Sequence, residues 1–353
     1  FIISTRQTDA TRDPSRFEQS HASLCERLTW TSLMDLEPLD RMSVSEWVRD
    51  SLGANGSLSL AALDSVAGNP LSIKALLYTA SEHFSEDEVL AHPSLEALLC
   101  RQFALWCTRT PHACVFAVQT LAVLGRSCPV DEWIGVMGRL GKATSLKTLT
   151  PAIEGRLIDR DRHGQIKFVH GAILEAALSR LCAAQRSFIH KEAAAFLEDE
   201  PSPDHARVAH HYSQCGAYAL AGERWMRTAL LLRDRADYPN FRWALIKAAN
   251  CFRLAKVDRS SKEWLELGIY WVLCRRVMGE SRWIQRRSED NVRRATATGN
   301  ESLIAHALRE HARLQRVVGG YSSAFPIMSQ ALDYALRVDD VAMQTVLQTD
   351  LAT

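Results

Sequence analysis

The sequence predicts a mainly α-helical protein of several parts that ends in an α-solenoid. With 353 residues the chain exceeds one ordinary domain, so two to four are expected. Helical periodicity covers everything beyond Pro201-Ser202-Pro203, whereas the clearest strand signals are an N-terminal run and one hairpin. We expect residues 1–28 to be the C-terminal edge of an α/β core, 29–94 a small helical domain, 95–200 a winged-helix-like domain and 201–353 helical repeats.

Composition narrows the possible function classes. A formal net charge of +1 gives no whole-chain attraction to nucleic acid or to an anionic membrane. No apolar run approaches the ~18 residues of a membrane span, and no signal peptide is visible. The nine cysteines are scattered without a Cys-x-x-Cys pair, which favours buried thiols in a reducing cytoplasm over a zinc site. We therefore expect a cytoplasmic protein.

The first six residues read Phe-Ile-Ile-Ser-Thr-Arg. An apolar, β-branched run that ends in small polar residues predicts a buried parallel strand of an α/β sheet. Ligands of such sheets bind at the carboxyl ends of the strands, where Arg6 could hold a phosphate with two hydrogen bonds. An ordinary surface arginine at a strand end is the alternative.

Residues 29–94 predict short helices separated by turns. Ser43 with Glu46 three residues later forms a capping-box pattern at the start of a helix that stops at Gly53. Gly68-Asn69-Pro70-Leu71 predicts a turn with Pro70 at the start of the next helix. Backbone amides at such a helix start can face an anion, although a plain helix-to-helix turn explains the same residues.

The pattern of residues 95–200 predicts four helices, at 95–107, 111–124, 131–137 and 145–154. Asp131 is expected to cap the third of them. Apolar strands at 157–158 and 166–168 flank a turn in which Gly164 supplies positive φ. From Gly171 the period changes to 3.6, which predicts one long helix whose apolar stripe includes Ile173 and Phe188. Helix, hairpin and helix together form a winged-helix-like unit.

His170 lies between this hairpin and the following helix and is a candidate site residue, although a lone histidine there is often structural. Binding of DNA by the unit is disfavoured, because residues 145–154 offer only Lys147 for base or phosphate contacts.

Small and aromatic residues recur at helical spacing beyond residue 203. Helix pairs of this kind with a period near ~34 residues indicate a tetratricopeptide-type solenoid. Three basic doublets, Arg275-Arg276, Arg286-Arg287 and Arg293-Arg294, are interrupted by acidic residues and predict a solvated face. The recurring positions are Ala209, Tyr212, Gly216, Ala221, Trp225, Thr228, Ala244, Ala248, Phe252, Ala255, Ala312, Gly319, Gly320, Ala324, Met328 and Ala331.

The order of these pieces resembles the second half of bacterial STAND signal-transduction ATPases. That class includes regulators akin to the maltose-type transcription activators and AAA-type ATPases attached to nucleotide cyclases or kinases. The order and spacing of the motifs are more specific than any single one, and they cover nearly the whole chain. The motifs are residues 1–6 (sensor-1 strand), Gly68-Asn69-Pro70-Leu71 (lid turn), residues 121–125, Gly155-Arg156-Leu157-Ile158, Phe168-Val169-His170, residues 186–190 and Ala209-His210-His211-Tyr212.

The resemblance implies a role for each candidate site residue. Arg6 would sense the γ-phosphate, Gly68 and Pro70 would form the lid turn with the proline against adenine, and His170 would reach the β-phosphate of ADP. ATP or ADP with Mg²⁺ is the implied cofactor. ADP would hold a closed resting state, whereas ATP with a protein or small-molecule inducer on the repeats would favour an open state that self-associates.

The same resemblance places the output, which is transcription control or cyclic-nucleotide synthesis, in a domain outside this chain, together with any contact to DNA. No membrane partner is expected. Val169-His170-Gly171 stands where plant and animal relatives have Met-His-Asp, so a role of that aspartate does not carry over.

The sequence holds no G-x-x-x-x-G-K-[ST] motif and no acidic strand end for magnesium. We therefore expect a fragment of a longer ATPase that does not hydrolyse ATP alone. The alternative is a non-enzymatic helical-repeat scaffold for protein–protein interaction, with a degenerate NTPase relic at its N-terminal end.

Overall fold

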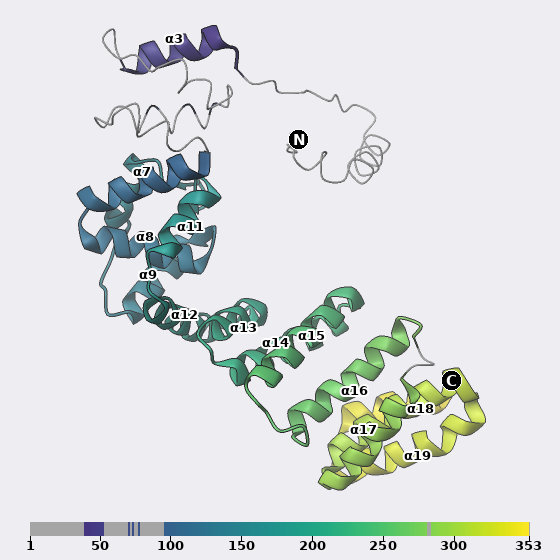
Figure 1. The fold of residues 1–353 in the computed structure, drawn as a ribbon. Helices are drawn as coiled ribbons and strands as arrows, with labels where there is room; N and C mark the ends of the chain where they lie inside the picture. Colours follow the sequence, from purple (N-terminus) through teal and green to yellow (C-terminus); the bar gives the residue numbers. More distant parts are fainter. Residues whose placement is uncertain are drawn as a thin grey trace. The chain divides into compact units, whose positions relative to one another are not determined.

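The computed structural model describes residues 39–52, 70, 73, 77, 95–280 and 284–352. The chain divides into two compact units, Phe1–Gln102 and Phe103–Thr353. The described part is mainly α-helical with one small sheet and continues into tetratricopeptide-like helix pairs, as predicted (Figure 1). None of its helices combines the length and the apolar character that a membrane span requires.

Helix α3 (Arg41–Leu52) of the first unit begins earlier than predicted. The Asp40 carboxylate accepts a hydrogen bond from the backbone N–H of Ser43 at 2.7 Å, so Asp40 occupies the position of the cap. The predicted capping box at Ser43 is therefore wrong. The apolar side chains of Val44 and Val48 lie one turn apart and are buried, which gives the helix its apolar face.

The second unit opens with helices around a three-stranded antiparallel sheet of order β1-β3-β2. Strand β1 is not predicted from the sequence because it has only three residues and ends in a proline. The hairpin turn is confirmed: Gly164 has φ +77° and the Asp161 carboxylate accepts from the N–H groups of His163 and Gln165. The boundary between the units falls within α7 (Leu95–Arg109). The elements that follow are α8 (His112–Leu124), β1 (Ser127–Pro129), α9 (Val130–Arg139), η1 (Leu146–Leu149), α10 (Thr150–Glu154), β2 (Ile158–Arg160) and β3 (Gln165–Phe168).

Two helix starts in this unit differ from the prediction. Helix α9 follows Pro129 directly, so Asp131 lies within its first turn and does not cap it. The long helix predicted from Gly171 is two helices, α11 (Gly171–Ser179) and α12 (Ala183–Glu198). The break forms because Cys182 and Gln185 make a reciprocal capping box. As a result Phe188 is exposed, contrary to the predicted stripe.

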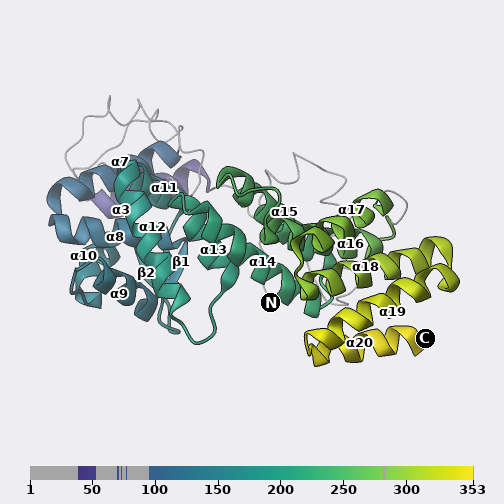
Figure 2. The same ribbon diagram turned by 90° about the horizontal axis from the view of Figure 1, so that it is seen from below.

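The helical repeats pack in chain order, and neighbours such as α14 with α15 and α18 with α19 lie side by side (Figures 1 and 2). Recurring alanines such as Ala221, Ala248 and Ala331 are buried, as predicted, whereas Ala255 is half-buried. The helices are α13 (His205–Gln214), α14 (Tyr218–Asp234), α15 (Tyr238–Leu254), α16 (Lys262–Val277), α17 (Gln285–Thr298), α18 (Glu301–Gly319), α19 (Tyr321–Arg337) and α20 (Val341–Ala352).

Two apolar cores run through the repeats, and α16 contributes to both. Its Leu267 and Cys274 pack with residues of α12 to α15, whereas its Leu265 and Ile269 pack with residues of α17 to α20. A helix with apolar residues on two opposite faces must be covered on both. This explains why α16 has no single apolar stripe.

Two surface predictions need correction. Arg276 lies against the buried Glu310, with 3.1 Å between guanidinium and carboxylate, and Arg275 pairs with Glu280, so the first basic doublet is not a solvated face. Among the described cysteines, Cys100 and Cys182 are exposed, contrary to the expectation of buried thiols.

The cap of α13 gives a first stability test. The Asp204 carboxylate accepts from the N–H groups of Ala206 and Arg207 at 3.0 and 3.2 Å. Asp204→Ala should therefore lower the free energy of unfolding by about 1 kcal/mol in urea titrations, because an N-cap bond is lost. Glu200→Ala, at an exposed position four residues earlier, is the control. Equal stability of the two variants would contradict the assignment of this cap.

Candidate functional site

The four predicted nucleotide contacts fall in different parts of the chain. Arg6 and Gly68 lie outside the described residues. Pro70 belongs to the first unit, where it is helical and exposed. His170 belongs to the second unit, where it is the N-cap of α11.

The backbone on both sides holds His170 in place. Strand β3 ends two residues before it, and the N–H of Val169 donates to the carbonyl of Leu157 at 3.1 Å. The Nδ1 atom of His170 accepts from the N–H of Ala172, also at 3.1 Å. A neutral imidazole that accepts at Nδ1 carries its proton on Nε2, so this side chain can donate a hydrogen bond from Nε2.

The start of α11 has the character of an anion-binding helix end. No acidic residue lies in its first turn. Gly171 leaves open space where a Cβ would stand. The N–H groups of Ala172 and Ile173 already donate to the Nδ1 atom and the carbonyl of His170. The helix dipole is therefore what favours the negative charge of a phosphate group at this helix start.

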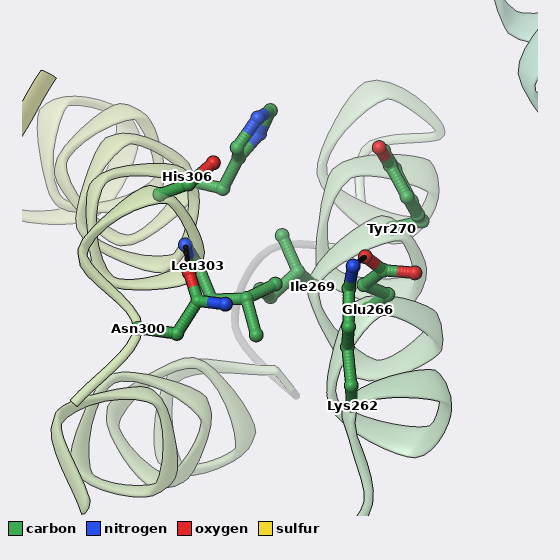
Figure 3. A pocket seen from close by; sticks show the side chains of 8 residues that line it. Lys262, Glu266, Ile269, Tyr270, Asn300, Leu303 and His306 are labelled. Atoms are coloured by element: carbon green, nitrogen blue, oxygen red, sulfur yellow. Dashed lines mark hydrogen bonds and ion pairs between the residues drawn. The ribbon is translucent and has the colours of Figure 1, made fainter. Parts of the chain in front are cut away.

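A second candidate site lies between α16 and α18, where side chains of both helices line a pocket of about 120 Å³ (Figure 3). Lys262, Glu266 and Tyr270 follow one another at intervals of four along α16. Across the pocket, Asn300, Ser302 and His306 belong to the start of α18. Ile269 and Leu303 are its apolar lining, one from each helix.

The pocket carries one cation and one anion among neutral polar groups. The Lys262 ammonium and the Glu266 carboxylate are 3.6 Å apart. Burial raises the pKa of Glu266, and the charge of Lys262 opposes that rise. Burial lowers the pKa of His306 and raises that of Tyr270, so both are neutral at neutral pH.

None of the residues that line this pocket is predicted from the sequence to form a site. The spacing of Lys262, Glu266 and Tyr270 could have indicated a polar stripe on one helix. The contact between α16 and α18 could not be predicted from sequence, because α17 separates the two helices along the chain and the contact depends on how the repeats pack.

Three histidines gather where α12 meets α13. The Nδ1 atoms of His190 and His211 are 2.8 Å apart, so one imidazole donates to the other, and His210 lies beside both. Both members of the pair are buried, so these two histidines belong to the packed interior between α12 and α13. Within the described residues, no group of three or more His, Cys, Asp or Glu side chains is arranged to hold a metal ion.

Comparison with known proteins gave a structural similarity. No protein-family model and no curated protein matches the chain. The chain is similar to a solved structure from Pyrococcus horikoshii, a signal transduction ATPase with numerous domains (STAND) that has a tetratricopeptide repeat sensor. The two are 12% identical with a TM-score of 0.41, and the match covers 91% of this chain and 57% of the other. This chain therefore spans a little over half the length of that protein.

Proposed function

We propose that this chain is part of a STAND-class, ATP/ADP-dependent signalling switch, either a transcriptional regulator or a cyclase- or kinase-linked ATPase. The observation that carries the proposal is the position of His170 at the start of α11, two residues after the end of strand β3 of the sheet. This order of helices and strands supports a winged-helix-like domain over residues 95–200. A helical lid over 29–94 and the edge of an NTPase core over 1–28 belong to the same proposal.

In this proposal His170 donates from Nε2 to a phosphate of ADP, and the N-terminus of α11 favours the negative charge. Arg6, Gly68 and Pro70 would complete the contacts. When bound, Mg²⁺ would supply charge neutralisation at the phosphates. The proposal assigns no ligands to it among the described residues.

The helical repeats are proposed as the part that binds an inducer or a protein partner. A ligand that binds the open state better than the closed one shifts the balance between them, and ADP acts in the opposite direction. Self-association of the open state and cytoplasmic localisation belong to the same proposal.

The first test is to read the coding sequence that precedes residue 1. The proposal requires a glycine-rich loop ending in Lys-Ser or Lys-Thr between a strand and a helix, followed by an acidic strand end. Absence of both motifs would reject it.

The second test is the affinity for ADP of the protein that carries this loop, measured by calorimetry. His170→Ala should weaken ADP binding by about tenfold or more, because a hydrogen bond to a charged phosphate is lost. His163→Ala, at an exposed position of the hairpin turn, is the matched control and should leave the affinity unchanged. Equal affinities of the two variants would remove His170 from the site.

A helical-repeat scaffold without enzymatic function is the second candidate. The exposed aromatic side chains of Trp243, Tyr321 and Phe325 favour it, because such residues are common in protein–protein interfaces. If the protein that contains this chain lacks the phosphate loop and does not bind ADP measurably, the scaffold is the correct candidate.

A further inference from the structure

We infer that the pocket between α16 and α18 binds a small free α-amino acid, whose carboxylate is held by Lys262 and whose ammonium group is held by Glu266. The inference rests on the proposed function only in making this amino acid the inducer of the switch. The binding itself depends on the pocket alone.

The size of the pocket limits the ligand. Its volume is about 120 Å³. For comparison, a cavity of about 150 Å³ in another protein accommodates benzene, which has six heavy atoms. The pocket is therefore suited to about five or six non-hydrogen atoms, the size of glycine or alanine.

The two charges of the pocket select a zwitterion. Lys262 and Glu266 lie one helical turn apart, with side-chain exposures of 60% and 35%. An ion pair this open to water contributes little to stability, so replacing it with contacts to a ligand costs little. A ligand with a single charge would satisfy one of the two residues and leave the other without a partner. A ligand with both charges satisfies each.

The remaining lining suits the uncharged part of an amino acid. Ile269 and Leu303 supply apolar contacts for the Cα and a methyl group (Figure 3). The polar groups of Tyr270, Ser302 and His306 are neutral, so they can donate to or accept from the ligand without adding charge. Among the residues that line the pocket, Lys262 is therefore the cation and Glu266 the anion.

Calorimetric titration of the 353-residue chain tests the inference with four probes. Alanine and glycine carry both charges, whereas propionate lacks the ammonium group and ethylamine lacks the carboxylate. We expect saturable binding of alanine and glycine, and binding of propionate and ethylamine that is about tenfold weaker or more, because each loses a charge-assisted hydrogen bond.

Two substitutions locate the site. Glu266→Gln should weaken alanine binding about tenfold but should not weaken propionate binding, because propionate has no ammonium group to lose and Lys262 no longer pairs with Glu266. Lys262→Gln should weaken alanine binding but should not weaken ethylamine binding, because ethylamine has no carboxylate to lose and Glu266 no longer pairs with Lys262. Asp290→Asn, in an exposed ion pair with Arg293 on the neighbouring α17, is the matched control and should change none of these affinities.

Three results would overturn the inference. The first is no binding of glycine or alanine at millimolar concentration to a chain that is folded by circular dichroism. The second is alanine binding that neither pocket substitution alters. The third is equal binding of alanine and propionate. Amino-acid binding in a protein without a phosphate loop would reject the proposed switch but leave this inference standing, so the two failures are distinguishable.

Discussion

Phe252→Ala should lower the free energy of unfolding by about 3–5 kcal/mol, because it removes a large buried ring from the first core of the repeats. Phe252 is 1% exposed. Its ring lies 5.9 Å from that of Trp264 on α16 and against Gly222 on α14. Urea titration followed by tryptophan fluorescence measures the effect. Leu254→Ala on the same helix, at a position that is 55% exposed, should cost less than about 0.5 kcal/mol.

Substitution of Gly222 tests the same contact from the opposite helix. A Cβ added at Gly222 would overlap the Phe252 ring, so Gly222→Ala should cost about 1–3 kcal/mol through overpacking. In the Phe252→Ala background the ring is gone, and the same substitution should be neutral or stabilising by up to about 1 kcal/mol, because alanine is the better helix former. Additive effects of the two substitutions would contradict the packing described for α14 and α15.

Acidification should unfold the protein through the buried pair of His190 and His211. Burial, together with the nearby His210 and Arg186, lowers the pKa of His190 to about 4. Burial, with His190, His210 and Arg207 nearby, lowers the pKa of His211 to about 3. In the unfolded chain both have a pKa of about 6.5. Below that pH the unfolded chain binds more protons than the folded one, so stability falls as pH falls.

Protonation of one histidine should lower the free energy of unfolding by about 3 kcal/mol between pH 6.5 and pH 4, and the second histidine should lower it further. Urea midpoints at pH 7, 6, 5 and 4 measure it. His211→Gln should cost about 1 kcal/mol at pH 7 through the lost hydrogen bond and should make the pH dependence shallower. His163→Gln in the exposed hairpin turn should leave the pH dependence unchanged. A pH dependence that is the same in all three proteins would contradict the prediction.

The helical character of the repeats could be read from sequence because it depends on local spacing. Ala244, Ala248 and Phe252 recur at intervals of four and are buried on one face of α15. The hairpin was equally readable, since Gly164 and Asp161 are turn residues with specific backbone roles.

What sequence could not supply depends on contacts between distant elements. The break between α11 and α12 depends on Cys182 acting as a cap, which is outside the usual set of capping residues. The ion pair of Arg276 depends on Glu310, 34 residues later. The pocket required α16 to face α18. Of the predicted nucleotide contacts, His170 is placed at a helix start, and its role in binding stays a prediction.

The two-sided packing of α16 has a consequence for how such an array can change in length. Solenoids of helical repeats are approximately modular, because each repeat contacts only its neighbours. Here a cut on either side of α16 would open a core, since the helix supplies Leu267 to one and Ile269 to the other. Deletion or duplication of repeats is therefore tolerated least at this helix, and a shortened protein that retains α16 must keep both flanking cores.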